Sequence, residues 1–143
     1  MTPSISGVEV LFVAGFGPIV SSLSASRACY LELLNLPLKP MPGNESYLNA
    51  EDLAGVKHFA LWPLEQASQS CFGSERWPAD YPVPQGWLEL EVVDLDAATQ
   101  TLKQRGYPLL VDNRLEPWGQ TVTRFLSPEG LLLGVTHTPW LRA

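Results

Sequence analysis

The sequence predicts an α+β protein built from two βαβββ modules in tandem. Two observations lead to this prediction: the order of one strand, one helix and three strands is clear over residues 86–138, and residues 8–64 repeat it less regularly. We therefore divide the chain into a first module over residues 1–64, a proline-rich connection over residues 65–85 with a short helix around Glu65 to Cys71, and a second module over residues 86–143.

The second module opens with the clearest elements of the chain. Polar and apolar residues alternate in GWLELEVVD (86–94), which predicts a strand, and the apolar positions of LDAATQTLKQRG (95–106) recur at helical spacing. Asp94 is a natural N-cap, and Gly106 provides the left-handed residue at which a helix ends. This segment therefore predicts a strand followed by a capped helix.

Three extended segments follow this helix. They are YPLLVDN (107–113), QTVTRFLS (120–127) and LLLGVTHT (131–138). The SPEG sequence between the last two predicts a tight hairpin turn, because Pro128 sets its own φ and Gly130 accepts a positive φ.

The first module follows the same order. Its helix is expected over residues 22–35, with Ser22 as the N-cap. The strands are expected over residues 8–20, 36–42, 45–52 and 56–64.

Composition and charge exclude several classes of protein. The 143 residues are 45% apolar and 17% charged, which is typical of a packed globular chain. The net charge of -6, with scattered Lys and Arg, argues against nucleic-acid binding. The N-terminus lacks a basic stretch followed by an apolar one, and Gly or Pro interrupts the longest apolar runs, so we expect a cytoplasmic protein that does not bind membranes. Cys29 and Cys71 have no metal-type spacing, and we expect both to be reduced.

The second module resembles the vicinal oxygen chelate superfamily, which includes glyoxalases, bleomycin-resistance proteins and extradiol dioxygenases. The resemblance rests on the strand, the Asp-capped helix, the Gly-Tyr-Pro exit (106–108), and the EPWGQ (116–120) and SPEG (127–130) sequences. It covers residues 86–136 along their whole length. The first module is similar more loosely, through residues 22–38 with Ser26 and Tyr30.

This resemblance implies curved mixed β-sheets around a central cavity. Enzymes of the superfamily hold a divalent metal with His or Glu at the start of the first strand and within the last strand of each module. In the second module these positions fall on Trp87 and Gly134, which cannot coordinate a metal. In the first module they fall on Gly15 or Val8, and on Phe59 with His58 beside it. We therefore expect no metal and no cofactor.

Several side chains are candidates for the cavity. A period of two places Trp87, Glu89 and Glu91 on the face away from the helix, where the carboxylates could hold a cation or act as a base; alternatively they are solvated or paired with Arg124. His58 either faces the central cavity or packs in the core. We expect His137 to be exposed.

Aromatic rings and one thiol complete the candidates. Trp62, Trp77 and Trp118 sit beside proline, where a large ring is difficult to bury without a cover, so they are either ligand or subunit contacts or caps on the ends of the sheets. Cys71 is a possible nucleophile only if His58 approaches it.

Three hypotheses of function follow. The first, drawn from the metal-free, acidic and dimeric bleomycin-resistance proteins, is a homodimer that sequesters an aromatic or cationic small molecule, with strands of both modules lining the cavities. The second is a metal-dependent lyase, isomerase or dioxygenase that uses His58 with Glu89 or Glu91. The third is an interaction module with a surface patch and no cavity. The expected ligand-binding residues are His58, Trp62, Trp87, Glu89, Glu91, Trp118 and Arg124. The sequence leaves open whether the modules pair within one chain or between chains.

Overall fold

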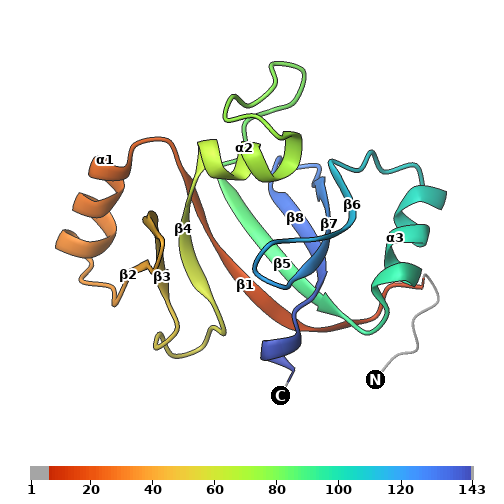
Figure 1. Ribbon diagram of the computed structural model, residues 1–143, viewed down its shortest axis with the longest axis horizontal. Helices are drawn as coiled ribbons and strands as arrows, with labels where there is room; N and C mark the ends of the chain where they lie inside the picture. The colour runs from red at the N-terminus through yellow and green to blue at the C-terminus, as the bar shows by residue number, and fades with distance from the viewer. Residues whose placement is uncertain (1–6, 143) are drawn as a thin grey trace.

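The computed structural model describes residues 7–142, whose strands form one eight-stranded mixed sheet in the order β2-β3-β4-β1-β5-β8-β7-β6 (Figure 1). The strands are β1 (Val10–Val20), β2 (Lys39–Met41), β3 (Asn44–Ala50), β4 (Phe59–Pro63), β5 (Gly86–Val92), β6 (Val111–Leu115), β7 (Thr121–Leu126) and β8 (Leu132–His137). The helices are α1 (Leu23–Arg27), continued by the π-helix η1 (Ala28–Leu33), α2 (Leu64–Phe72), α3 (Leu95–Gln104) and the 3₁₀-helix η2 (Pro139–Leu141). Both βαβββ modules are present.

The two modules join within one chain. Strand β1 pairs in parallel with β4 and antiparallel with β5, which in turn pairs in parallel with β8. Replacing β1–β4 by β5–β8 reverses the strand order, so the modules are related by an approximate twofold axis between β1 and β5. The modules, whose pairing within one chain or between chains the sequence leaves open, therefore pair within one chain.

One face of the sheet is covered at its two ends by α1 and α3. In the first module Leu48, Phe59 and Leu61 form a buried cluster on which Leu23 and Leu31 pack. In the second module Val92 and Val135 pack with Leu95, Ala98 and Leu102 of α3. Figure 1 shows α1 and α3 at opposite ends of the sheet, with β1 and β5 between them.

The opposite face is covered in its middle by α2. Ala67 and Cys71 of this helix belong to a buried cluster with Trp62, Trp87 and Val122. Trp87 alternates along β5 with the residues of the other face, so α2 lies on the concave side, opposite α3. The connection between the modules therefore fills part of the concave side of the sheet.

Local signals for helix ends and turns are confirmed. Ser22 and Asp94 cap α1 and α3, and their side-chain oxygens accept the backbone N–H groups of Ala25 and Ala97. Gly130, with a φ of 86°, closes the SPEG turn by donating its N–H to the Ser127 carbonyl at 2.9 Å.

One predicted helix changes its hydrogen-bond pattern, and one predicted strand boundary is wrong. The helix expected over residues 22–35 changes to a π-helix at Ala28, and the Leu34 N–H donates to the Cys29 carbonyl five residues earlier, a pattern that apolar spacing does not encode. The strand expected from residue 107 begins at Val111, because the Gly106 and Tyr107 N–H groups bond back to Lys103 and Leu102 in a Schellman motif.

Among residues 7–142 no helix is both long and apolar enough to span a bilayer.

Candidate functional site

The aromatic floor of the concave face is formed by Trp62 of β4 and Trp87 of β5. Their ring centroids lie 6.1 Å apart in an edge-to-face arrangement, and the Trp87 Nε1–H donates to the Ala60 carbonyl at 3.2 Å. Only 7% and 4% of their surfaces are exposed, and Trp77 is also buried. The cover that rings beside proline were expected to need is provided by α2 and its following loop.

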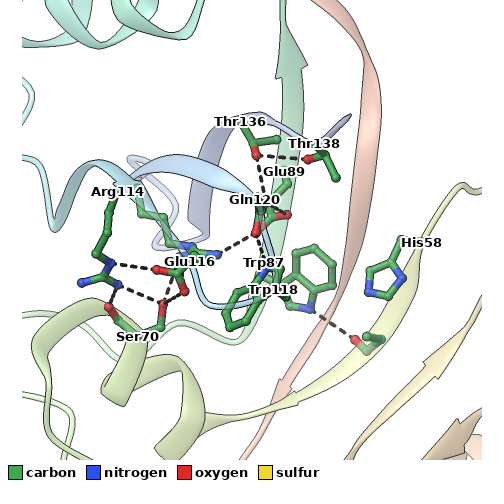
Figure 2. Close-up of polar contacts among 12 residues, drawn as sticks. His58, Ser70, Trp87, Glu89, Arg114, Glu116, Trp118, Gln120, Thr136 and Thr138 are labelled. Carbon is green, nitrogen blue, oxygen red and sulfur yellow. Dashed lines mark hydrogen bonds and ion pairs between the residues drawn. The ribbon is translucent and has the colours of Figure 1, made fainter. Parts of the chain in front are cut away.

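A buried ion network lies beside these rings. The Arg124 guanidinium, 2% exposed, donates to Glu89 Oε2 and Ser70 Oγ, each at 3.0 Å, and lies 3.9 Å from Glu116 Oε2. Glu116 also accepts from Ser70 Oγ at 3.1 Å and from Arg114 Nε at 2.7 Å (Figure 2). The buried Glu116 and the partly exposed Glu89 thus share one buried guanidinium, and Ser70 links α2 to the network. Glu89 and Arg124 are predicted from the sequence, whereas Ser70, Arg114 and Glu116 are not.

The EPWGQ loop fixes the second oxygen of Glu89. Gln120 Nε2 donates to Glu89 Oε1 and to Thr136 Oγ1, each at 2.8 Å. Trp118 Nε1 donates to Gln120 Oε1 at 2.8 Å, while 53% of Trp118 is exposed (Figure 2). Both oxygens of Glu89 are therefore oriented by fixed donors, and Trp118 lies at the outer end of this chain of hydrogen bonds.

His58 is paired with a tyrosine that the sequence did not single out. The Tyr47 hydroxyl and His58 Nε2 are 2.8 Å apart, and the two rings stack with centroids 6.1 Å apart. Burial lowers the pKa of His58 from 6.5, although Glu89 and Glu51 act in the opposite direction. Burial, with the negative charge of Glu89, raises the pKa of Tyr47 above its usual value of 10. At neutral pH the pair is an uncharged imidazole and a protonated phenol.

The open part of the concave face is a cleft of about 240 Å³ between the sheet and the C-terminal segment. His58 and Glu89 lie on the sheet side, and Trp140, 54% exposed, lies on the side of the C-terminal segment. The cleft is lined by Ala14, Glu51, Lys57, His58, Glu89, Thr138, Trp140 and Leu141. Of the seven predicted ligand-binding residues, the structure brings only His58 and Glu89 to this cleft.

Glu91 holds the C-terminal wall of the cleft in place. It shares the face of Trp87 and Glu89, as predicted, but it is fully buried, and its Oε2 accepts from the Thr138 N–H and from Arg142 Nε at 2.6 Å each. Arg142 also donates to the Val92 carbonyl. The expectation that the Glu91 side chain points into the cavity is wrong, because residues 138–142 cover it.

The side chains present do not fit the divalent metal that the fold implies. Within residues 7–142 no group of three or more His, Cys, Asp or Glu could hold an ion together. At Gly15 even a Cβ would lie 2.9 Å from the His58 carbonyl and 3.0 Å from the Trp87 ring, so no coordinating side chain fits there. Tryptophan and glycine at Trp87 and Gly134 are not metal ligands.

The environment of Cys71 does not favour a nucleophile. The thiol is buried, and burial raises its pKa to about 11, although Arg124 and Arg114 act in the opposite direction. At neutral pH it is a protonated thiol in an apolar cluster, whereas nucleophilic cysteines are thiolates in electropositive sites. His137, in contrast, is exposed as expected.

Comparisons with known proteins relate the architecture to solved structures. No protein-family model matches the sequence, and no curated protein matches it significantly. A glyoxalase/bleomycin resistance protein/dioxygenase superfamily member from Vibrio splendidus matches with a TM-score of 0.56 and 14% identity over 92% of this chain and 99% of that one. Methylmalonyl-CoA epimerase from Streptomyces coelicolor matches with a TM-score of 0.54 and 18% identity over 92% and 96%. An NAD-dependent benzaldehyde dehydrogenase from Legionella pneumophila matches with a TM-score of 0.54 and 12% identity over 85% and 96%. These matches across most of the chain show that it has the fold of the glyoxalase/bleomycin resistance protein/dioxygenase superfamily.

Proposed function

We propose that this protein binds a small aromatic cation in the cleft between His58, Glu89 and Trp140, without a metal, and sequesters it. The observation that carries the proposal is the combination of two carboxylates, an uncharged imidazole and an exposed indole around one cleft. Carboxylates attract a cation, and an indole face both stacks on an aromatic ring and binds a cation through its π-system.

The charges around the cleft support a cationic ligand. Glu51 and Glu89 contribute two carboxylates and Lys57 one ammonium group, which lies 4.7 Å from the centre of the Phe12 ring. Glu89 is held by Arg124 and Gln120, but a carboxylate has about four acceptor positions and these donors use two. Glu51 is exposed at the mouth, in a chain whose net charge is -6. An approaching cation therefore meets the Glu51 carboxylate first, at the mouth of the cleft, and then the Glu89 carboxylate on the sheet.

The size of the cleft limits the ligand. A volume of about 240 Å³ lies below the roughly 300–1,000 Å³ of pockets that enclose drug-sized molecules. The epimerase complex contains 2-nitronate-propionyl-CoA, which is far larger than this cleft could enclose. The buried Trp62 and Trp87 are separated from solvent by α2, so Trp140 is the aromatic surface that a ligand in this cleft meets. These limits favour a single-ring amine over a large drug or a coenzyme ester.

Binding of 2-phenylethylamine, with 3-phenylpropionate as an anionic probe of similar size, tests the proposal. We expect the amine to bind and the acid not to bind, when each is titrated into the protein and followed by NMR chemical shifts. Trp140→Ala and Glu51→Gln change exposed positions and should leave the fold intact. Trp140→Ala is expected to weaken binding of the amine up to about tenfold or more, because a cation–π contact is worth roughly 0.5–2 kcal/mol. Glu51→Gln is expected to weaken it about two- to fivefold, because an exposed ion pair is worth less than about 1 kcal/mol.

His137→Gln is the matched control, because it alters an exposed residue that does not line the cleft. Equal binding of the amine and the acid, or amine binding that is unchanged in both Trp140→Ala and Glu51→Gln, would contradict the proposal. Stoichiometric zinc, iron or nickel in the purified protein would contradict its metal-free part.

His58 also predicts how stability depends on pH. Because burial lowers the pKa of His58 in the folded state, the unfolded chain binds a proton more readily near pH 6.5. Stability should therefore be fully present above pH 6.5 and should decrease as the pH falls from 6.5 towards 5. We expect His58→Gln to flatten this part of the profile, as measured by urea unfolding at each pH. A wild-type profile that rises on acidification over this interval would show that the predicted sign is wrong.

A further inference from the structure

We infer that Glu91 and Arg142 are positioning residues that set the affinity of the cleft, because they hold the C-terminal segment, residues 138–142, closed over it. The inference rests on the proposed function and gives a role to two residues that do not line the cleft. The segment forms one wall of the cleft and the sheet forms the other. A ligand that contacts both walls is bound tightly only while the segment is closed.

A single carboxylate oxygen holds both ends of the segment. In the described part of the chain, the hydrogen bonds from residues 139–142 to the sheet all come from the Arg142 side chain. It donates from Nε to Glu91 Oε2 at 2.6 Å and from Nη2 to the Val92 carbonyl. The same Glu91 oxygen accepts from the Thr138 N–H at 2.6 Å. Loss of either charge of this pair therefore releases the far end of the segment.

The segment is short and stiff, so it opens and closes as one unit. The Leu141 N–H donates to the Thr138 carbonyl at 3.0 Å, and the Arg142 N–H donates to the Pro139 carbonyl at 3.2 Å, which closes the turn η2. Pro139 also fixes its own φ. Trp140 is 54% exposed in this turn, so its position at the cleft depends on the two ends of the segment more than on burial of its ring.

A chain of hydrogen bonds joins the segment to the Glu89 carboxylate (Figure 2). Gln120 Nε2 donates one hydrogen to Glu89 and the other to the Thr136 hydroxyl. Thr136 donates its own hydrogen to the Thr121 carbonyl at 3.0 Å, so the Thr138 hydroxyl is the donor in its 3.2 Å contact with Thr136. The donor that orients Glu89 is thus linked to the closed segment.

The bound ligand and the closed segment therefore stabilise each other. The contacts with both walls and the hydrogen-bond chain to Glu89 are complete only in the closed state. Linkage requires that closure strengthens ligand binding by the same factor by which the ligand strengthens closure. The apparent Kd rises as the closed fraction falls, so weakening the hold of Glu91 weakens binding from outside the cleft.

Hydrogen exchange of residues 138–142, measured by mass spectrometry, tests the inference without a ligand. Arg142→Gln is expected to accelerate exchange of these amides about tenfold or more, because it removes a charge-assisted bond that resists local opening. Arg105→Gln is the matched control, since it removes the same charge from an exposed position at the end of α3. It should leave exchange of the segment unchanged.

Binding of 2-phenylethylamine provides the second readout. The amine should slow exchange of the segment in the wild-type protein, and Arg142→Gln should weaken its binding about threefold or more. In a Trp140→Ala background the same substitution should weaken binding by a smaller factor, because the indole that the segment presents to the ligand is already gone. A residue that supports only the overall fold would not show this dependence on Trp140.

Unchanged exchange in Arg142→Gln would overturn the inference, whether or not the amine binds. Amine binding of equal strength in the wild type and in Arg142→Gln would also overturn it, while leaving the proposed function intact. Loss of affinity by the same factor with and without Trp140 would show that Arg142 does not act through the segment. Absence of amine binding to the wild type contradicts the proposed function instead, and the exchange result then decides whether Glu91 holds the segment.

Glu91→Gln makes the same test should Arg142→Gln lose its far-UV circular dichroism. It removes the ion pair without leaving a carboxylate buried beside no cation, and Arg142, whose side chain is 24% exposed, can be solvated. The variant is expected to show faster exchange of the segment and weaker amine binding. A folded Glu91→Gln variant with wild-type exchange and wild-type affinity contradicts the inference.

Discussion

Replacing Arg124 with methionine is expected to destabilise the protein by about 3–5 kcal/mol, because removal of one partner leaves a buried charge uncompensated. Arg124 is 2% exposed and donates to Glu89, while Glu116, 4% exposed, lies 3.9 Å away. Without the guanidinium, Glu89, whose side chain is 14% exposed, would lose its ion pair, Glu116 would keep only Arg114, and Ser70 of α2 would lose one of its donors. Urea unfolding followed by tryptophan fluorescence measures the loss.

The exposed pair Lys103–Asp112 is the control for this prediction. Its charged atoms lie 2.7 Å apart, which is closer than those of Arg124 and Glu89, but its side chains are 44% and 50% exposed. Lys103→Met should therefore cost less than about 1 kcal/mol, because solvent screens exposed ion pairs. If the buried network acts as described, adding Glu89→Gln to Arg124→Met should recover part of the lost stability. Equal losses for Arg124→Met and Lys103→Met would show that the buried network does not stabilise the fold.

Replacing Gly17 with alanine is expected to cost about 3 kcal/mol, at the upper end of what overpacking usually costs. A Cβ at this position would lie 2.0 Å from the Ala60 carbonyl oxygen and 3.0 Å from its carbonyl carbon. These are backbone atoms of the neighbouring strand β4, so the clash can be relieved only by separating β1 from β4. The same carbonyl accepts from Trp87 Nε1, so the shift should also disturb the aromatic floor.

Gly86→Ala provides the comparison, because Gly86 lies opposite Pro18 on the adjoining strand. Its Cβ would lie 3.3 Å from the Gly17 carbonyl oxygen and from Leu131, a gap that a shift of a few tenths of an ångström relieves. Thermal and urea unfolding of both variants should rank Gly17→Ala as clearly the less stable. A loss for Gly17→Ala no larger than that for Gly86→Ala would mean that β1 and β4 are not packed as tightly as described.

Local sequence patterns were sufficient for the order of the elements and for several of their caps and turns. The alternation in β5 correctly separated Trp87 and Glu89 from the residues that α3 covers, because side chains of a strand alternate between its two faces. Asp94 and Gly130 were assigned correctly because a cap and a tight turn depend on residues only a few positions away. The same reasoning failed at η1, where the hydrogen bonds change register within a run that has helical spacing.

The candidate site was only partly predictable, because its contacts join distant segments. His58 and Glu89 were expected at the cavity, but Tyr47 on another strand of the first module was not. The link from Ser70 to Arg124 spans 54 residues, and that from Glu91 to Arg142 spans 51. No local pattern relates residues so far apart.

The sequence by itself determined that the chain alternates strands and helices as two βαβββ modules, which face of β5 is apolar, and where helices and turns are capped. Only the tertiary structure decided that α2 covers Trp62 and Trp87, that residues 138–142 cover Glu91, and that His58 and Glu89 remain at the open cleft. The physical reason is that periodicity and capping act over a few residues, whereas access to solvent depends on which distant segment packs over a given side chain.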